Sequence, residues 1–217
     1  MLPGLMPVWI KICGVTSVAD AELAVSAGAD AVGVNLVPSS KRFVDEPTAR
    51  AIAAAVSARV EVVAVVADRT LEELRGLPAR LGLRTLQLHG SEEPALVAAL
   101  GETAYQAVRI GTASDVARAR QFTGERLLAD AKVEGALGGT GHVFDWSLVA
   151  ELGRERALVL AGGLTADNVA LAVERVRPYG VDTASGVESG NPRAKDRDKV
   201  FRFVAEARRA AAALDLR

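Results

Sequence analysis

The chain has 217 residues, half of them hydrophobic, and its 26 basic and 27 acidic residues leave a net charge of −1. This balance gives no electrostatic reason to expect nucleic acid or an anionic membrane as a partner. The single cysteine cannot close an internal disulfide, residues 1–7 lack the features of a signal peptide, and no apolar stretch reaches the roughly 20 residues that span a bilayer. We therefore expect a cytoplasmic protein with one α/β domain over residues 1–217.

Strand and helix patterns alternate along the whole chain. Apolar runs with strand character begin at Val8, Ala31, Val60, Thr85, Tyr105, Arg126, Ala157 and Val181. Amphipathic helical segments lie between them, including Ser17–Ala27, Glu46–Val56, Leu71–Leu81, Ala166–Arg175 and Asp196–Ala213. Repeated βα units predict parallel strands that close into a single (β/α)8 TIM barrel. The alternative is an open doubly wound sheet, which usually has fewer strands and a glycine-rich nucleotide loop after the first one.

The first expected strand alternates between two kinds of side chain. Ile10 and Ile12 share one face, whereas Lys11 and Cys13 share the other. Because the apolar face of a barrel strand packs on the helices, Lys11 and Cys13 are expected inside, near the rim that carries active sites. Lys11 is expected to pair with an interior carboxylate such as Asp182 and to favour the thiolate. A Schiff-base lysine and an inert buried thiol are the alternatives.

Polar residues also end the fourth and sixth strands. Gln87 and His89 share a polar face, which predicts that His89 is a hydrogen-bonded residue at the rim. Asp130 ends the sixth strand and precedes the glycine-rich stretch 131–145, whose length is typical of functional loops. A partly buried carboxylate can donate a proton while Cys13 removes another across a small substrate. A helix cap or a salt bridge is the alternative role for Asp130.

Two glycine turns follow the last strands. Gly162-Gly163 comes after the seventh strand, and Ser185-Gly186 comes after the eighth. Glycines at these places let backbone N–H groups approach an anion, and barrels often bind a substrate phosphate there. We expect a phosphate site, with two tight turns that bind nothing as the alternative.

Arg42 follows the second strand, where its guanidinium could hold a substrate carboxylate in bidentate fashion. A solvated surface arginine is the alternative. The two histidines, His89 and His142, do not have the spacing of metal ligands, so we expect no catalytic metal.

Six short motifs occur in one order and together cover nearly the whole chain. They are Lys11-Ile12-Cys13-Gly14, Ser40-Lys41-Arg42-Phe43-Val44, Gln87-Leu88-His89-Gly90, Gly138-Gly139-Thr140-Gly141 with Phe144-Asp145-Trp146, Leu160-Ala161-Gly162-Gly163-Leu164, and Ser185-Gly186-Val187-Glu188. This ordered set closely resembles the phosphoribosylanthranilate isomerase family of tryptophan biosynthesis.

The resemblance implies a single-domain barrel, monomeric or homodimeric, that uses no cofactor and acts on a small-molecule phosphosugar. Its reaction would be the Amadori rearrangement of N-(5-phosphoribosyl)anthranilate to 1-(2-carboxyphenylamino)-1-deoxyribulose 5-phosphate. By this resemblance Asp130 protonates the ring oxygen, and Cys13, as a thiolate, removes the proton from C2. The expected substrate-binding residues are Lys11, Arg42, His89 and Asp182.

Two other functions stay open. One is a dual-substrate phosphoribosyl isomerase that also serves histidine biosynthesis, although such enzymes generally use two aspartates. The other is a non-catalytic phosphosugar-binding barrel, which the presence of both Cys13 and Asp130 disfavours.

Overall fold

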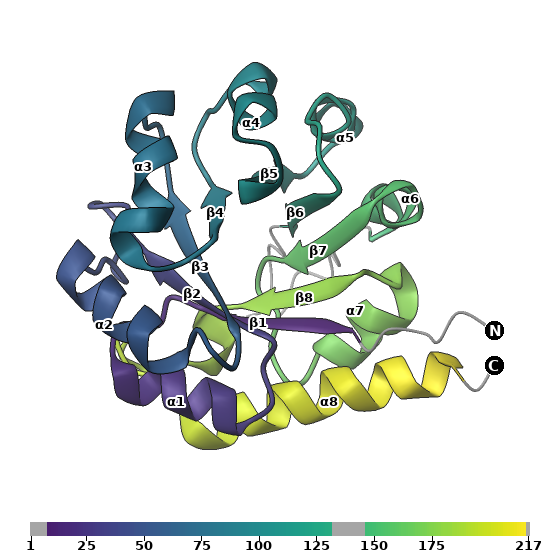
Figure 1. Ribbon diagram of the computed structural model, residues 1–217. Coiled ribbons are helices and arrows are strands. Elements are labelled where there is room, and N and C mark those ends of the chain that lie inside the picture. Colours follow the sequence, from purple (N-terminus) through teal and green to yellow (C-terminus); the bar gives the residue numbers. More distant parts are fainter. Residues whose placement is uncertain (1–7, 132–145, 216–217) are drawn as a thin grey trace, which may run out of the picture.

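The computed structural model of the protein describes residues 8–131 and 146–215. Eight parallel strands form a closed barrel in which each strand pairs with its neighbour in sequence, and β8 (Gly180–Thr183) pairs with β1 (Trp9–Cys13) (Figure 1). The expected (β/α)8 barrel is therefore confirmed, and the open doubly wound sheet is wrong.

Every expected strand start lies within one residue of the observed one, as for Val8 against Trp9. The remaining strands are β2 (Ala31–Asn35), β3 (Glu61–Val66), β4 (Thr85–Leu88), β5 (Ala104–Ile110), β6 (Arg126–Ala131) and β7 (Ala157–Ala161). The helices are α1 (Val18–Ser26), α2 (Glu46–Val56), α3 (Leu71–Leu81), α4 (Pro94–Leu100), α5 (Ala113–Ala119), α6 (Ser147–Glu155), α7 (Val169–Val176) and α8 (Arg197–Asp215), with 3₁₀ turns η1 (Gly101–Thr103) and η2 (Ser185–Val187).

Local capping explains why some helix bounds match the expected ones. At the start of α3 the Thr70 backbone N–H donates to Glu73 Oε2 at 2.8 Å, while the Thr70 side chain accepts from the Glu73 N–H. At the start of α7 the expectation is wrong by three residues, since the helix begins at Val169 and not at Ala166. There the Thr165 N–H donates to the Asn168 side chain at 2.8 Å and forms a turn before the helix.

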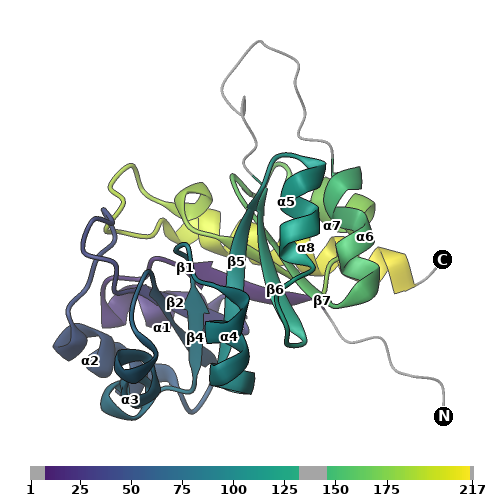
Figure 2. The same ribbon diagram turned by 90° about the horizontal axis from the view of Figure 1, so that it is seen from above.

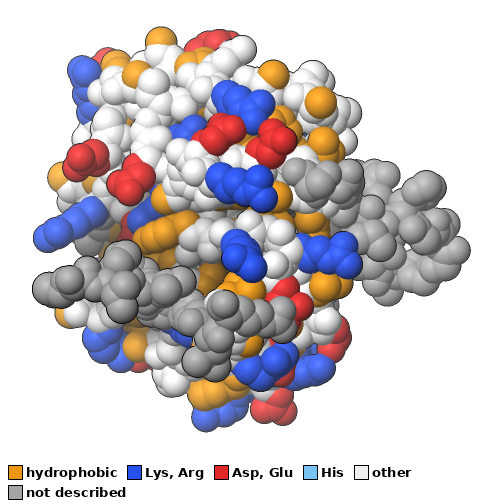
Figure 3. Space-filling model, turned by 90° about the vertical axis from the view of Figure 1, so that its right-hand side faces the viewer, with side chains coloured by type: hydrophobic (Ala, Val, Ile, Leu, Met, Phe, Trp, Pro, Cys, Tyr) orange, Lys and Arg blue, Asp and Glu red, His pale blue; other side chains and the backbone are white. Residues whose placement is uncertain are grey.

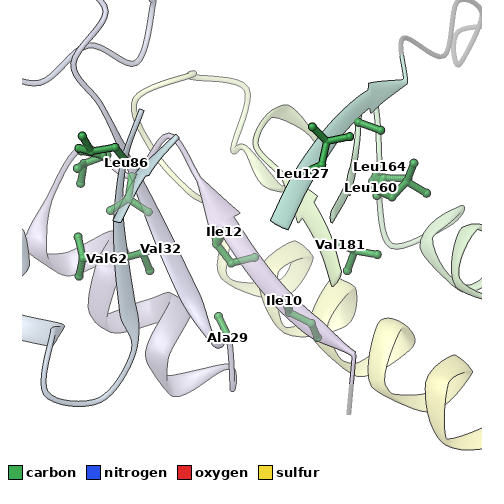
Figure 4. Packing of buried hydrophobic residues seen from close by; sticks show 14 of the residues in the cluster. Ile10, Ile12, Ala29, Val32, Val62, Leu86, Leu127, Leu160, Leu164 and Val181 are labelled. Atoms are coloured by element: carbon green, nitrogen blue, oxygen red, sulfur yellow. The ribbon is translucent and has the colours of Figure 1, made fainter. Parts of the chain in front are cut away.

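The barrel strands separate two apolar layers, one outside the barrel and one inside it. Ile10 and Ile12 are fully buried in the outer layer, between the sheet and the helices, where Figure 4 shows them with Val181. The inner layer fills the barrel and includes Trp9 and Tyr105. Because successive strand residues point to opposite faces, this arrangement puts Lys11 and Cys13 inside the barrel, as the alternation predicts.

An ion pair and aromatic rings close the amino-terminal end of the barrel. The Arg126 guanidinium lies 2.9 Å from Glu61 Oε1, and its carbon lies 4.8 Å from the ring centroid of Trp9 and 5.3 Å from that of Tyr105. Thr85 also donates its hydroxyl to Glu61 at 2.6 Å. The charged and polar groups at this end pair with one another, as expected for the face of a barrel that contributes to stability. Active sites of such barrels lie at the opposite, carboxyl end of the strands.

The helices complete the outer ring. Figure 2 shows α5, α6 and α7 gathered on one flank and α2 and α3 on the opposite one, and α8 contacts both α7 and α1. Acidic and basic side chains are interspersed on the face shown in Figure 3, in keeping with the balanced net charge. Within the two described ranges, no helix is both long enough and apolar enough to cross a membrane.

Candidate active site

A cavity of about 230 Å³ lies at the carboxyl ends of the strands. Most of the site residues expected from the sequence line it, namely Cys13, Arg42, His89, Asp130, Gly162, Gly163, Asp182 and Ser185. Lys11 lies beneath this surface, fully buried, and Gly186 is not part of the lining. A larger hollow of about 760 Å³ lies at the opposite end, beside Asp30 and Glu61, away from every one of these residues.

Strand pairing brings Lys11 and Asp182 together. The two residues are partners in the β1–β8 register, and Lys11 Nζ lies 2.9 Å from Asp182 Oδ1. Cys13 is the partner of Gly33 in the β1–β2 register. A Cβ atom on Gly33 would lie 2.7 Å from the Cys13 sulfur and 3.3 Å from Lys11 Nζ. Glycine in β2 therefore provides the space that the thiol and the ammonium occupy.

Burial decides the protonation of Cys13. It raises the pKa of the thiol above its ordinary value, and this effect exceeds the opposing effect of the Lys11 ammonium. The expected influence of Lys11 has the right sign, but the sum favours the neutral thiol near neutral pH. Burial lowers the pKa of Lys11, yet electrostatic attraction, first of all to the Asp182 carboxylate, outweighs burial and raises that pKa overall. Lys11 therefore stays charged, which argues against a Schiff-base role.

A chain of polar contacts leads from the barrel interior to Asp130. Tyr105 donates its hydroxyl to Gln87 Oε1 at 3.0 Å, so the Gln87 amide nitrogen donates to His89 Nδ1 at 3.1 Å. The proton of neutral His89 is then on Nε2, which lies 3.4 Å from Asp130 Oδ2. Asp130 therefore contacts a rim histidine in the cavity and does not cap a helix.

Arg42 lines the cavity and is not a freely solvated surface residue. Its Nε lies 2.5 Å from Glu188 Oε1, and its side chain is one-quarter exposed. The Arg42 side chain packs across Gly14, where a Cβ atom would overlap it and where φ is +68°. Gly14 of the first motif is thus needed both for its backbone conformation and for the approach of Arg42.

The two glycine turns fit against each other at the ends of β7 and β8. Gly162 and Gly163 have φ angles of +95° and +67°, which favour glycine. Gly186 packs so closely on Leu164 that a Cβ atom would overlap its carbonyl oxygen. Thr183 adds a hydroxyl bond to the same carbonyl at 2.7 Å. Three of the four expected phosphate residues line the cavity, whereas Gly186 packs behind them.

The sequence does not single out two residues that the structure places near the cavity. Glu188 stands out in the sequence only as the last residue of a motif, and Lys195 resembles an ordinary lysine of a surface loop. In the structure Lys195 is buried, and its Nζ donates to the carbonyl of Ala184 at 3.1 Å. Burial lowers the pKa of Lys195, and Cys13 and Glu188 oppose this effect. No local sequence signal marks a loop lysine that folds back under a barrel mouth.

Other expectations fall on undescribed residues. His142 and nearly all of the glycine-rich stretch expected at 131–145 lie outside the described residues. Among residues 8–131 and 146–215, no group of three or more His, Cys, Asp or Glu side chains is arranged to hold a metal ion.

A thiol, a carboxylate and an arginine meet two glycine turns at the carboxyl ends of the strands, which is the face where (β/α)8-barrel enzymes carry their active sites. The fold and the place of this site put the protein in the class of (β/α)8-barrel enzymes. Residues 10–206 match the family model of N-(5'phosphoribosyl)anthranilate (PRA) isomerase, and the chain belongs to this family.

Individual relatives support this assignment over nearly the whole chain. An N-(5'-phosphoribosyl)anthranilate isomerase of Magnetococcus marinus is 43% identical over 205 residues, 94% of this chain and 97% of the relative. The crystal structure of phosphoribosyl anthranilate isomerase from Thermotoga maritima has a TM-score of 0.82 and 36% identity, covering 92% of this chain and 98% of that one. A crystal structure of a phosphoribosyl anthranilate isomerase in complex with reduced 1-(o-carboxyphenylamino)-1-deoxyribulose 5-phosphate has a TM-score of 0.80 and 35% identity, covering 92% of this chain and 98% of that one. The resemblance drawn from the motifs is confirmed.

Proposed function

We propose that the chain converts N-(5'-phosphoribosyl)anthranilate to 1-(2-carboxyphenylamino)-1-deoxyribulose 5-phosphate, as a phosphoribosylanthranilate isomerase of tryptophan biosynthesis. The observation that carries this proposal is the convergence of Cys13 and Asp130 on one cavity from β1 and β6. Family membership supports it as well. An aldose-to-ketose rearrangement needs an acid and a base and no net oxidation, which this pair supplies.

The reaction proceeds by two proton transfers. Asp130 donates a proton to the furanose ring oxygen as the bond from C1 to that oxygen breaks, and the anilino nitrogen forms a Schiff base with C1. Cys13, as a thiolate, removes the proton from C2, and the electron pair forms the C1–C2 double bond of an enolamine. Transfer of a proton from the C2 hydroxyl to C1 then yields the ketone, an isomer of the substrate.

The groups around the acid and base support these transfers. His89 presents its Nε2 proton toward Asp130, which stabilises the carboxylate once its proton has left. The Lys11 ammonium lowers the cost of charge on Cys13, and Asp182 holds Lys11 in place from β8. Lys11 thus acts through its neighbours, whereas His89 and Asp182 line the cavity and are positioned to contact the sugar hydroxyls.

The two ends of the substrate are held by different groups. The backbone turns at Gly162-Gly163 and Ser185 bind the phosphate, with Gly186 packed behind them. Arg42 binds the anthranilate carboxylate through a bidentate contact. Anchoring both ends holds C1 and C2 between Asp130 and Cys13, and such positioning contributes to the rate.

The deciding experiment follows loss of N-(5'-phosphoribosyl)anthranilate with the purified protein, with the histidine-pathway aminoaldose assayed in parallel. Turnover of the first substrate alone is the expected result. Turnover of both would establish the dual-substrate enzyme, and binding without any turnover would establish the non-catalytic barrel.

We also infer that residues 1–217 form one domain, since the first strand of the barrel begins at residue 9 and its last helix ends at residue 215. That the protein is a monomer or a homodimer stays a prediction. Its cytoplasmic location, expected from the lone cysteine, also stays a prediction.

A further inference from the structure

We propose that Lys195 is a positioning residue for recognition of the substrate carboxylate, because it holds Glu188 in the place from which Glu188 orients Arg42. This inference rests on the proposed function, since it concerns the substrate end that Arg42 binds. Neither Lys195 nor Glu188 lines the cavity. Both act through the arginine, which does.

The contact between Lys195 and Glu188 is built into the loop after β8. The two residues form an isolated antiparallel β-bridge, which brings them opposite each other across the loop. The Lys195 side chain is fully buried, with Nζ 3.1 Å from the carbonyl of Ala184 and 3.7 Å from Glu188 Oε1. A buried ammonium needs such partners, because an unpaired charge away from water is costly. Its position is therefore determined by these two groups.

Glu188 in turn lies between two cations. The same oxygen, Oε1, is 2.5 Å from Arg42 Nε and 3.7 Å from Lys195 Nζ, and the Glu188 side chain is only 11% exposed. Within the described residues, the side chain of Arg42 contacts this carboxylate through Nε alone. The terminal nitrogens of Arg42 are then available to a second carboxylate, and the planar guanidinium is fixed by its Nε contact.

Charge explains why Lys195 is needed in addition to Arg42. With only one cation beside it, a nearly buried glutamate would draw the whole guanidinium toward itself and compete with the substrate for it. Lys195 shares the negative charge of Glu188, and this sharing leaves Arg42 free to attract a second carboxylate. Through Ala184, which precedes the phosphate turn at Ser185, Lys195 also connects the two ends of the site.

The loop itself is held by other contacts. The N–H of Ser189 donates to the carbonyl of Ala194 at 3.1 Å, and the N–H of Asp196 donates to that of Val187 at 2.9 Å. The exposed Lys199 donates its Nζ to the backbone carbonyl of Glu188 at 2.8 Å. Removal of the Lys195 ammonium therefore leaves the loop backbone in place. Lys199, which touches the backbone but not the carboxylate of Glu188, is a matched control.

The test measures binding of two probes by calorimetry. One is the reduced product 1-(2-carboxyphenylamino)-1-deoxyribitol 5-phosphate, and the other is its phenylamino counterpart without the carboxyl group. For Lys195→Met we expect Kd of the first probe to rise about tenfold and Kd of the second to change less than about twofold. Lys199→Met should leave both Kd values unchanged, and Arg42→Ala should abolish the preference for the carboxylated probe.

The outcomes separate this inference from the proposed function. Failure of the unaltered protein to bind either probe would overturn the proposed function. A normal preference in folded Lys195→Met, or an equal loss for both probes, would overturn the role of Lys195. Should thermal unfolding show that Lys195→Met does not fold, Lys195→Gln, which can still donate to Ala184 without the charge, is tested by the same criterion.

Discussion

Cys13 is subject to two opposing effects at the scale of the single residue. Burial disfavours its thiolate, while Lys11 on the same strand favours it, and burial has the larger effect. Cys13 can therefore act as a base only in the small fraction of molecules in which its proton has been removed. A thiolate formed from a high-pKa thiol is, however, intrinsically a stronger base. The negative phosphate and carboxylate of a bound substrate do not favour ionisation either, so pH should control the fraction of Cys13 that is present as thiolate.

The pH dependence follows from this balance. A base acts only when deprotonated, and the deprotonated fraction of Cys13 grows as pH rises through a pKa above its ordinary value of about 8.5. We expect the rate at which an alkylating reagent modifies Cys13, the single cysteine of the chain, to keep increasing beyond that pH, because only the thiolate reacts. A profile already flat at neutral pH would show that Cys13 ionises readily and would contradict the dominance of burial.

Substitution of the two catalytic groups tests their roles directly. Cys13→Ala and Asp130→Asn should each lower kcat by about 10²–10⁴-fold, the range typical of general acid–base groups. Neither change removes a large core side chain, so the midpoint of thermal unfolding should stay within a few degrees of the unaltered protein. Near-normal kcat in a folded variant would reassign that residue.

At the scale of the element, strand pairing places the chemistry. Lys11 meets Asp182 because the β1–β8 register makes them partners, and Cys13 meets Gly33 through the β1–β2 register. Interior positions of a barrel at the same height compete for space, so one strand must present a small residue where its neighbour presents a large one. Gly33 fills that role in β2.

The need for a small residue in β2 makes a prediction for both stability and activity. In Gly33→Ala the new methyl group would lie 2.7 Å from the Cys13 sulfur, so the thiol or the backbone must shift. Overpacking of this kind costs about 1–3 kcal/mol of stability, and displacement of the base should also lower kcat more than tenfold. Chemical denaturation and steady-state kinetics measure the two effects. The matched control is Gly153→Ala in α6, where the new Cβ atom would meet no atom closer than 3.5 Å, and this change should leave kcat unchanged.

At the scale of the whole molecule, one end of the barrel contributes to stability and the other carries the active-site cavity. Arg126, Glu61 and the rings of Trp9 and Tyr105 close the amino-terminal end. The carboxyl end carries the cavity with Cys13. A barrel separates stability from function in this way because its strand termini meet at opposite faces.

This division predicts that stability and activity can be changed separately. Arg126→Met removes a partly buried charge that pairs with Glu61 and lies over aromatic rings, which should cost about 1–3 kcal/mol in the free energy of unfolding. Measured well below the unfolding transition, kcat should stay within about twofold. A large loss of kcat without loss of stability would show that the two ends are coupled, with Tyr105 as the connecting residue.

Local patterns in the sequence determine the barrel and much of its site. The alternation of Ile10 and Ile12 with Lys11 and Cys13 assigns an inside and an outside, because the side-chain period of a strand is two. Since the carboxyl ends of parallel strands meet at one rim, residues that end strands, such as Asp130, converge without further information.

Only the tertiary structure determines which polar groups satisfy one another. Arg42 pairs with Glu188 although 146 positions separate them in the chain, and Lys195 returns beneath the barrel mouth through an irregular loop. The protonation of Cys13 likewise depends on the fold, because burial raises the pKa of its thiol and the nearby Lys11 ammonium lowers it. Periodicity along a strand is a local property that the sequence carries by itself. Loop paths, burial and pairing between distant residues arise from packing, and they exist only once the barrel has closed.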